Sequence, residues 1–171
     1  ANDDYAAIIN DGHVARLLAL VDDARSKGAE VIEVNPGGEP VDPALSRKLP
    51  FYLVLDPTDD MAVMQQEIFG PILPIVEYDD LDGALQYVSE RPRPLAAYYF
   101  GTDGHEQSRV LESVVAGSIV VNDVRCQIFF EQLPFGGVGM SGMGRYRGFQ
   151  GFVTFSNAKT VLYQMQSDDV L

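Results

Sequence analysis

Apolar side chains recur at steps of three and four residues between residues 11 and 27, which is the period of a helix with one buried face. Asp11 opens this run and is expected to cap the helix, because its carboxylate can accept hydrogen bonds from the free amides of the first turn. Gly28 follows the run, as is typical where a helix ends in a left-handed residue. The inward face is expected to consist of Val14, Leu17, Leu18, Val21 and Ala24.

Short apolar runs and further helical periods alternate as far as residue 121. Strands are predicted over residues 31–34, 51–55, 72–78, 95–100 and 118–121, helices from Asp79 or Asp80 to about 90 and from 103 to about 115, and a proline-rich loop over 35–50. Pro74 would place its strand at an edge or a bulge, because proline has no amide hydrogen to donate. Two successive strand–helix–strand units predict parallel neighbours in one sheet, and therefore an α/β fold.

The periodic pattern stops after Asn122 and returns only over residues 159–165, where apolar and polar positions alternate as in an isolated strand. The intervening segment is rich in glycine, and all of the acidic residues except Asp168 and Asp169 lie before Gln132. Because glycine permits close backbone approach, this segment is either a buried loop that lines the core or a place that tolerates an anion.

The composition narrows the class of protein. The 171 residues fit one ordinary domain, and 25 acidic residues against 12 basic ones give a formal net charge of −13. Such a charge repels phosphate backbones and anionic lipid, so we expect no nucleic-acid partner and no binding to a membrane surface. No apolar run reaches the roughly 18 residues of a membrane span.

The single cysteine, Cys126, excludes an internal disulfide framework and a multi-cysteine metal site, and suits a reducing compartment. The acidic start at Ala1 has no signal-peptide character, so a cytoplasmic protein is expected. The chain also lacks a starting Met, which fits either a cut from a longer chain or removal of Met before Ala. With only His13 and His105 beside the one cysteine, no zinc site is expected.

Two further features resemble catalytic motifs but lack the required context. Residues 137–142 match G-x-G-x-x-G, yet no strand directly precedes them and no acidic residue follows at the distance needed for a ribose contact. A tightly packed glycine turn is the favoured interpretation. Cys126 could be a nucleophile activated by Arg125, but both histidines are distant in sequence and are expected at the surface. A structural or incidental cysteine is favoured.

Residues 67–71, Glu-Ile-Phe-Gly-Pro, place an acidic and an aromatic side chain at a turn before a predicted strand. A carboxylate there could accept hydrogen bonds from a sugar diol, and the aromatic ring could brace a planar group. From the chemistry of these residues by itself, a solvated acid and a core phenylalanine are the favoured interpretation.

Residues 66–75 resemble the E-E-I-F-G-P segment of the aldehyde dehydrogenase superfamily, and residues 133–144 resemble its P-F-G-G-x-x-x-S-G-x-G segment in matching order and separation. Residues 8–13, 121–123 and 154–156 are similar to the class 3 branch, particularly coniferyl aldehyde dehydrogenases. The resemblance implies three layers, with a mostly parallel sheet flanked by helices and a late strand of the oligomerisation type.

The resemblance also implies roles for individual residues. Glu67 would hydrogen-bond the nicotinamide ribose of NAD or NADP, and Phe69 would pack beside the nicotinamide. Phe135 would line the tunnel for the aldehyde substrate. The loop over residues 124–132 would contact the aldehyde side chain, where Phe129 and Phe130 would suit an aromatic substrate such as a cinnamaldehyde.

The domain organisation implied by the resemblance is that residues 1–157 form the C-terminal part of a catalytic domain, and residues 158–171 an oligomerisation strand and tail of a homodimer. In the family the nucleophilic cysteine, the general-base glutamate and the cofactor domain all lie N-terminal to the segment matching residues 8–10. The chain is therefore expected to carry no catalytic residue and to be inactive by itself. Two alternatives remain: a non-catalytic binding or assembly module, or an unrelated small enzyme that uses Cys126.

Overall fold

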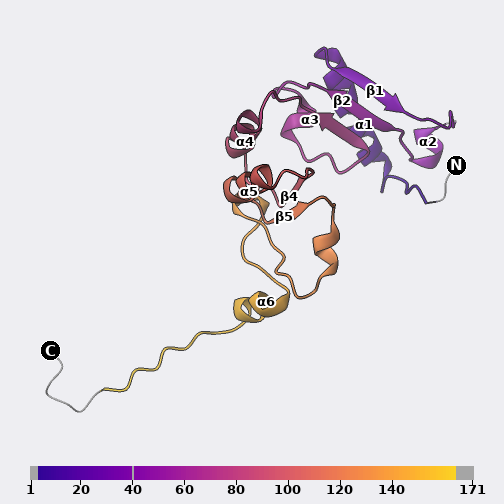
Figure 1. Cartoon of the computed structure of the whole chain (residues 1–171). Helices are drawn as coiled ribbons and strands as arrows, with labels where there is room; N and C mark the ends of the chain where they lie inside the picture. The colour runs from indigo at the N-terminus through magenta and orange to yellow at the C-terminus, as the bar shows by residue number, and fades with distance from the viewer. Residues whose placement is uncertain (1–3, 40, 165–171) are drawn as a thin grey trace. The chain divides into compact units, whose positions relative to one another are not determined.

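The computed structural model describes residues 4–39 and 41–164, which fall into two units, residues 1–77 and residues 78–171 (Figure 1). Each unit has its own sheet. In unit 1 the strand order is β1-β2-β3, and in unit 2 β4 pairs with β5. The alternation of helices and strands confirms the predicted α/β class.

Unit 1 packs helix α1 (Asp11–Ser26) against a three-stranded sheet, with α1 running behind the strands in Figure 1. The strands are β1 (Glu30–Val34), β2 (Phe51–Leu55) and β3 (Ile72–Ile75). β1 is antiparallel to β2, and β2 is parallel to β3. The four-residue helix α3 (Ala62–Gln65) precedes the turn that leads into β3.

The buried core of unit 1 joins the inner face of α1 to the sheet. Helix α1 contributes Val14, Leu17, Leu20, Val21 and Ala24, and the rest of the core consists of Leu49, Tyr52, Val54, Met61, Val63 and Ile72. The sequence pattern was therefore wrong at one position: Leu20 is buried where Leu18 was expected, and Leu18 packs at the margin of the core.

The cap of α1 also differs from the prediction. Asn10, not Asp11, is the N-cap: its backbone is extended, and its side-chain oxygen accepts a hydrogen bond from the His13 amide over 2.8 Å. Asp11 already belongs to the first turn, where a negative charge is favourable at the positive end of the helix dipole. Gly28, at φ +94°, ends the helix in the left-handed region as expected.

The proline-rich loop contains one short helix that the sequence reading missed, α2 (Pro43–Ser46). Asp42 caps it by accepting a hydrogen bond from the Ala44 amide. Pro43 occupies the first turn, where the amide hydrogen that proline lacks has no acceptor within the helix and its fixed φ already suits a helix.

The described strands form one sheet within each unit, whereas the sequence pattern predicts a single sheet. The carbonyl oxygens of Pro71, just before β3, and of Ile75, at its end, accept from the Tyr52 and Asp56 amides on the β2 side. The backbone of the alternate residue Pro74 therefore faces the other edge of β3. Since proline has no amide hydrogen, this edge lacks one of the donors that a further strand would need.

Unit 2 begins with the predicted crossover: α4 (Leu81–Ser89), β4 (Ala96–Tyr99), α5 (Gly104–Ser113) and β5 (Ser118–Val121). β4 and β5 are parallel, as the intervening helix requires. Asp80 caps α4 and Asp103 caps α5. Hydrogen bonds from the amides of Glu106 and His105 lower the pKa of the Asp103 carboxyl.

After β5 the backbone is mainly loop, with two short 3₁₀ turns, η1 (Cys126–Phe129) and η2 (Gly139–Ser141), and one helix, α6 (Gly148–Thr154). The late strand expected over residues 159–165 is absent from 159–164, and Met165 lies outside the described residues. A strand gains its backbone hydrogen bonds from a neighbouring strand, and in the single chain residues 159–164 pair with none.

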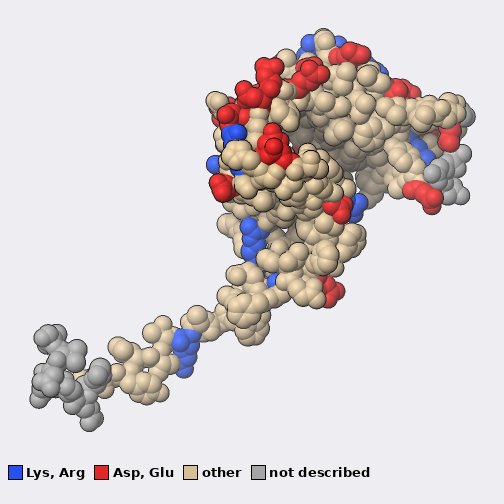
Figure 2. Space-filling view, viewed as in Figure 1, with Lys and Arg blue, Asp and Glu red and all other residues tan. Residues whose placement is uncertain are grey.

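Charge is distributed as the sequence suggested. Figure 2 shows acidic side chains over much of the surface, whereas residues 157–164 of the C-terminal segment include one basic residue, Lys159, and no acidic one. Exposed aromatic and aliphatic residues occupy the acid-free region over residues 132–164 instead, including Phe149, Phe152, Phe155 and Leu162.

Candidate active-site segments

The Glu67–Phe69 segment forms the turn between α3 and β3 in unit 1. Both side chains face solvent, and Phe69 is 79% exposed. The core position considered for Phe69 is therefore wrong. Within the described residues the Glu67 carboxylate makes no hydrogen bond or ion pair, so both its oxygens are available to a ligand.

The backbone of this turn, in contrast, is held firmly by two side chains of α1. The Arg16 guanidinium donates to the carbonyl oxygens of Glu67, over 3.2 Å, and of Ile68. The His13 ring contacts the Phe69 carbonyl oxygen through Nε2 at 3.0 Å. Because a carbonyl oxygen only accepts, His13 Nε2 carries the hydrogen.

Two further features fix the turn. Phe69 itself has a φ of +51°, a conformation that non-glycine residues rarely adopt and that the surrounding hydrogen bonds maintain. Gly70 then approaches the side chain of buried Leu17 so closely that a Cβ atom on residue 70 would overlap it. The backbone of the turn is therefore held in place, while the side chains of Glu67 and Phe69 are exposed.

The second segment, in unit 2, is built on a two-residue bridge between Phe135 and Tyr146. Their backbones exchange hydrogen bonds of 2.8 and 2.9 Å, and their rings meet edge to face with centroids 5.4 Å apart. Arg145 donates from one guanidinium nitrogen to the carbonyl oxygens of Gly117, over 2.9 Å, and of Gly136. These contacts attach the half-buried Phe135 to the start of β5.

The glycine motif over 137–142 is a packed turn and not a dinucleotide loop. Ser141 Oγ accepts from the Val138 amide and donates to the Val138 carbonyl oxygen, which closes the turn on itself. Gly137 lies against the backbone of Ser141 and Gly142, where a Cβ atom would not fit. This confirms the interpretation favoured from the sequence.

Phe129 and Phe130 lie at the end of η1 and are 75% and 54% exposed. The chain turns into η1 at Arg125, whose φ is +59°. Gln127 attaches η1 to the sheet through Ser118 Oγ, to which its amide nitrogen donates over 3.2 Å. Both phenylalanines and Phe135 thus belong to one unit, whereas Glu67 and Phe69 belong to the other.

Cys126 opens η1 and is half-buried. In the part of the chain that the structure describes, it makes no hydrogen bond with a histidine or any other base. His105 is exposed at the start of α5, as expected, whereas His13 is half-buried against Phe69 and is not the simple surface residue expected.

The sequence reading missed three residues that organise these segments: His13, Arg16 and Arg147. The first two are one helical turn apart on the same face of α1, a spacing visible in the sequence. Arg147 lies in a segment without acidic residues, and its guanidinium contacts the Ile128 carbonyl oxygen and the rings of Phe135 and Tyr146.

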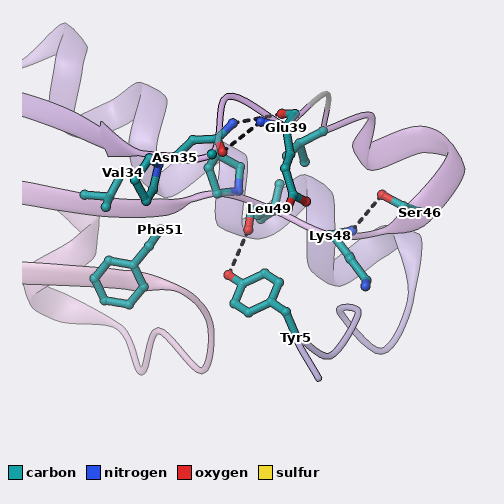
Figure 3. Close-up of a pocket in the computed structure, with 12 residues that line it drawn as sticks. Tyr5, Val34, Asn35, Glu39, Ser46, Lys48, Leu49 and Phe51 are labelled. Atoms are coloured by element: carbon teal, nitrogen blue, oxygen red, sulfur yellow. Dashed lines mark hydrogen bonds between the residues drawn. The ribbon is translucent and has the colours of Figure 1, made fainter. Parts of the chain in front are cut away.

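A cavity of about 600 Å³ in unit 1 lies between Tyr5, the end of β1 and residues 46–51 (Figure 3). The Tyr5 hydroxyl donates to the Leu49 carbonyl oxygen over 2.8 Å, and burial raises the Tyr5 pKa. Neither Glu67 nor Phe69 lines this cavity, so it is not the expected cofactor site. No helix among residues 4–39 and 41–164 has the length and apolarity to cross a bilayer.

Comparison with known proteins settles the family. The model of the aldehyde dehydrogenase family matches residues 1–161, which include both motif segments. The chain belongs to the aldehyde dehydrogenase family. A probable coniferyl aldehyde dehydrogenase of Caulobacter vibrioides is 52% identical over 98% of this chain and 34% of its own length. A coniferyl aldehyde dehydrogenase of a Pseudomonas species is 48% identical over 95% of this chain and 34% of its own.

Solved structures agree with the sequence relatives. The substrate-bound state of Staphylococcus aureus AldH has a TM-score of 0.78 at 36% identity, over 95% of this chain and 35% of that one. A Mycobacterium tuberculosis aldehyde dehydrogenase complexed with NAD⁺ has a TM-score of 0.81 at 26% identity, over 95% and 32%. The chain thus spans about a third of the length of the relatives it matches.

Proposed function

We propose that this chain is part of an NAD- or NADP-dependent aldehyde dehydrogenase that oxidises an aromatic aldehyde, such as coniferyl aldehyde, to the carboxylic acid. The observation that carries the proposal is the identity of about half of all positions, over nearly the whole chain, with relatives named coniferyl aldehyde dehydrogenases. Family membership favours the oxidation of an aldehyde, and the degree of identity favours the aromatic substrate.

The cofactor side of the proposed function rests on Glu67 and Phe69. A free, exposed carboxylate can accept hydrogen bonds from both hydroxyls of a ribose, and the exposed ring beside it can cover a planar nicotinamide face. The NAD(P) cofactor supplies the hydride acceptor for the oxidation. The contribution of this chain is to hold the carboxylate and ring in place through Arg16 and His13.

The substrate side rests on Phe135, with Phe129 and Phe130 on the neighbouring turn. Exposed rings on a short, anchored loop offer apolar area for an aromatic side chain at little cost in side-chain entropy. We infer that these rings line the path of the aldehyde, and that the nucleophilic cysteine and general-base glutamate come from the remainder of the enzyme. The 171-residue chain by itself is then inactive.

A hybrid enzyme tests the proposal. This chain replaces the matched third of the Caulobacter relative, and NAD(P)H formation is followed with coniferyl aldehyde. We expect the hybrid to be active and the 171-residue chain by itself to be inactive. An inactive hybrid, in a soluble preparation where the parent relative is active, would overturn the proposal. Activity of the chain by itself that Cys126→Ala abolishes would instead support a small enzyme using Cys126.

The ribose role is tested by Glu67→Gln in the hybrid, with Glu112→Gln on the exposed face of α5 as the matched control. The loss of a charge-assisted acceptor predicts a weaker cofactor interaction by roughly 10-fold in kcat/KM for the cofactor. An equal effect of both substitutions would argue against a specific contact at Glu67.

The assembly module remains a second candidate, favoured by the exposed apolar side chains of α6 and the C-terminal segment. Phe149, Phe152 and Phe155 are 76%, 70% and 84% exposed, and Leu162 is 91% exposed. Such a surface is typical of an interface, and we propose that it joins two copies, with residues 158–171 as the oligomerisation strand. Two results together would favour this candidate over the enzyme. The hybrid enzyme would be inactive, and sedimentation of the 171-residue chain would show concentration-dependent association without NAD(P).

A further inference from the structure

Arg147 joins the two substrate-side elements of unit 2. Its guanidinium donates to the carbonyl oxygen of Ile128 in η1 over 2.5 Å. The same guanidinium lies over the ring of Phe135, 5.4 Å from its centroid, and over that of Tyr146 at 5.7 Å. One side chain therefore contacts the turn that carries Phe129 and the ring expected to line the aldehyde path.

The charge of Arg147 is not used in an ion pair within the described residues. The partners of the guanidinium are the Ile128 carbonyl oxygen and the faces of the Phe135 and Tyr146 rings, and the carboxylate of Glu131 lines the same cavity without an ion pair to it. A guanidinium is well suited to this arrangement, because it is planar and can stack on rings while donating from its edge.

The backbone at Arg147 supports a specific role. Its φ is +69°, a region that non-glycine residues rarely adopt, and the next residue, Gly148, has a φ of +54°. A Cβ atom on residue 148 would overlap the carbonyl oxygen of Gln132. Strained backbone of this kind persists where the surrounding structure requires it, often at ligand sites. Here the strain directs the Arg147 side chain from the start of α6 toward η1 and Phe135.

A cavity of about 480 Å³ is lined by Ile128, Phe129, Glu131 and Arg147. Ile128 and Phe129 belong to η1, the turn that Arg147 holds, and Glu131 lies two residues after its end. Arg147 therefore both lines this cavity and holds the carbonyl oxygen of Ile128, another of its lining residues.

We propose that Arg147 is a positioning residue that fixes the Phe135 ring and the η1 turn relative to each other, and so sets the preference of the enzyme for bulky aromatic aldehydes. The proposal rests on the proposed function for its substrate. A short aliphatic aldehyde touches little of the path wall, so its oxidation depends much less on this contact. The cofactor side, built on Glu67, does not depend on it.

The first test uses the 171-residue chain and needs no activity. Hydrogen exchange is measured at the amide of Ile128, which donates to the Arg125 carbonyl oxygen in the η1 turn, and at that of Leu133, which donates to the Phe130 carbonyl oxygen just after it. Arg147→Met should reduce the protection of both amides from exchange, while exchange over residues 51–55 of β2 should stay unchanged. The control is Arg93→Met, since Arg93 donates to the Ser89 carbonyl oxygen near the end of α4. Unchanged protection at Ile128 in Arg147→Met would overturn the proposal.

The second test uses the hybrid enzyme and separates positioning from general damage. Arg147→Met should raise KM for coniferyl aldehyde about 10-fold, with KM for propanal and for the cofactor unchanged. Arg147→Lys, which keeps a cation and a donor, should recover part of the loss. Equal losses with both aldehydes, or a raised cofactor KM, would overturn the proposal. If the unsubstituted hybrid is inactive, the proposed function fails, and the exchange measurement still decides the role of Arg147.

Discussion

The Arg16 guanidinium donates a hydrogen bond to the carbonyl oxygen of Glu67 over 3.2 Å, from the helix that forms the core of unit 1. The same group holds the next carbonyl, of Ile68, and His13 holds the one after it. Three successive carbonyls are thus attached to one face of α1. This arrangement orders the backbone of the turn without engaging the side chains of Glu67 and Phe69.

Arg16→Gln is therefore expected to loosen the turn. A glutamine is too short to replace both guanidinium contacts. Hydrogen exchange should therefore become faster at the amides of Gln66 and Ile72, which donate to Ala62 and Gly70 at the two ends of the turn, and stay unchanged over residues 30–34. The control is Arg25→Gln on the same helix, whose guanidinium lies over the Tyr52 ring instead. Slow exchange at the turn in Arg16→Gln would show that the backbone is held by other means.

The core beneath the turn is expected to be sensitive at Leu17, which is fully buried and touches the turn at Gly70. Leu17→Ala should lower the free energy of unfolding by about 2–5 kcal/mol, because it removes buried methyl groups and leaves a cavity. Leu45→Ala, at a side chain that is 86% exposed, should change it by no more than about 0.5 kcal/mol. Urea unfolding followed by circular dichroism measures both, and equal effects would contradict the assignment of the core.

The stability of unit 1 should depend on pH through Asp23. Its carboxylate accepts from the Ala62 amide at 2.7 Å and pairs with Lys27 at 3.0 Å, and these contacts, the amide first, lower its pKa. A lowered pKa means that the unfolded chain binds the proton more readily. The stabilisation of the fold by the ionised Asp23 carboxylate is thus complete at pH values above the ordinary Asp pKa of about 3.9. It is lost as the pH falls through the lowered pKa that Asp23 has in the folded chain.

Comparison of the native chain with Asp23→Asn by urea unfolding checks this dependence. The native chain should be the more stable at pH 7, and the difference should shrink below the ordinary Asp pKa. Asp22→Asn, at the neighbouring exposed position, controls for the change in net charge. A difference that stays constant with pH would rule out the ionised Asp23 contact as its origin.

Local patterns predicted most of the fold. The strand over 51–55 and the strand over 118–121 match the prediction residue for residue, because each is a short apolar run between turn-forming residues. The caps at Asp80 and Asp103 likewise follow from local chemistry. The cap at Asn10 could not be predicted in this way, because Asn10 and Asp11 are both good N-cap residues. The choice between them depends on where the helical dihedral angles begin.

Contacts between distant residues could not be predicted in this way. Glu67 and Phe69 were identified through a family motif, but nothing in that motif indicates that Arg16, 51 residues earlier, holds their carbonyls. The contact of Arg147 with Ile128 is of the same kind. Hydrogen bonds from an arginine to backbone carbonyl oxygens cannot be recognised from the pattern of charged residues, because every residue has a backbone carbonyl group.

Gly137 is expected to tolerate no side chain. Gly137→Ala would place a Cβ atom against the backbone of Ser141 and Gly142, which cannot yield as a flexible side chain would. We expect a loss of about 1–3 kcal/mol in the free energy of unfolding of unit 2, together with faster exchange at the amides of Val138 and Gly142.

Gly104→Ala is the matched control, because a Cβ atom there meets nothing within 4 Å and the residue lies at the start of α5. Alanine is the better helix former, so this substitution should be neutral or stabilising by up to about 1 kcal/mol. Equal stability of the two variants would mean that the turn over 137–142 opens to admit a methyl group. Arg145 holds the Gly136 carbonyl oxygen directly before this turn. A turn that opens so easily would mean that Phe135, the residue before Gly136, is also held less firmly than this contact implies.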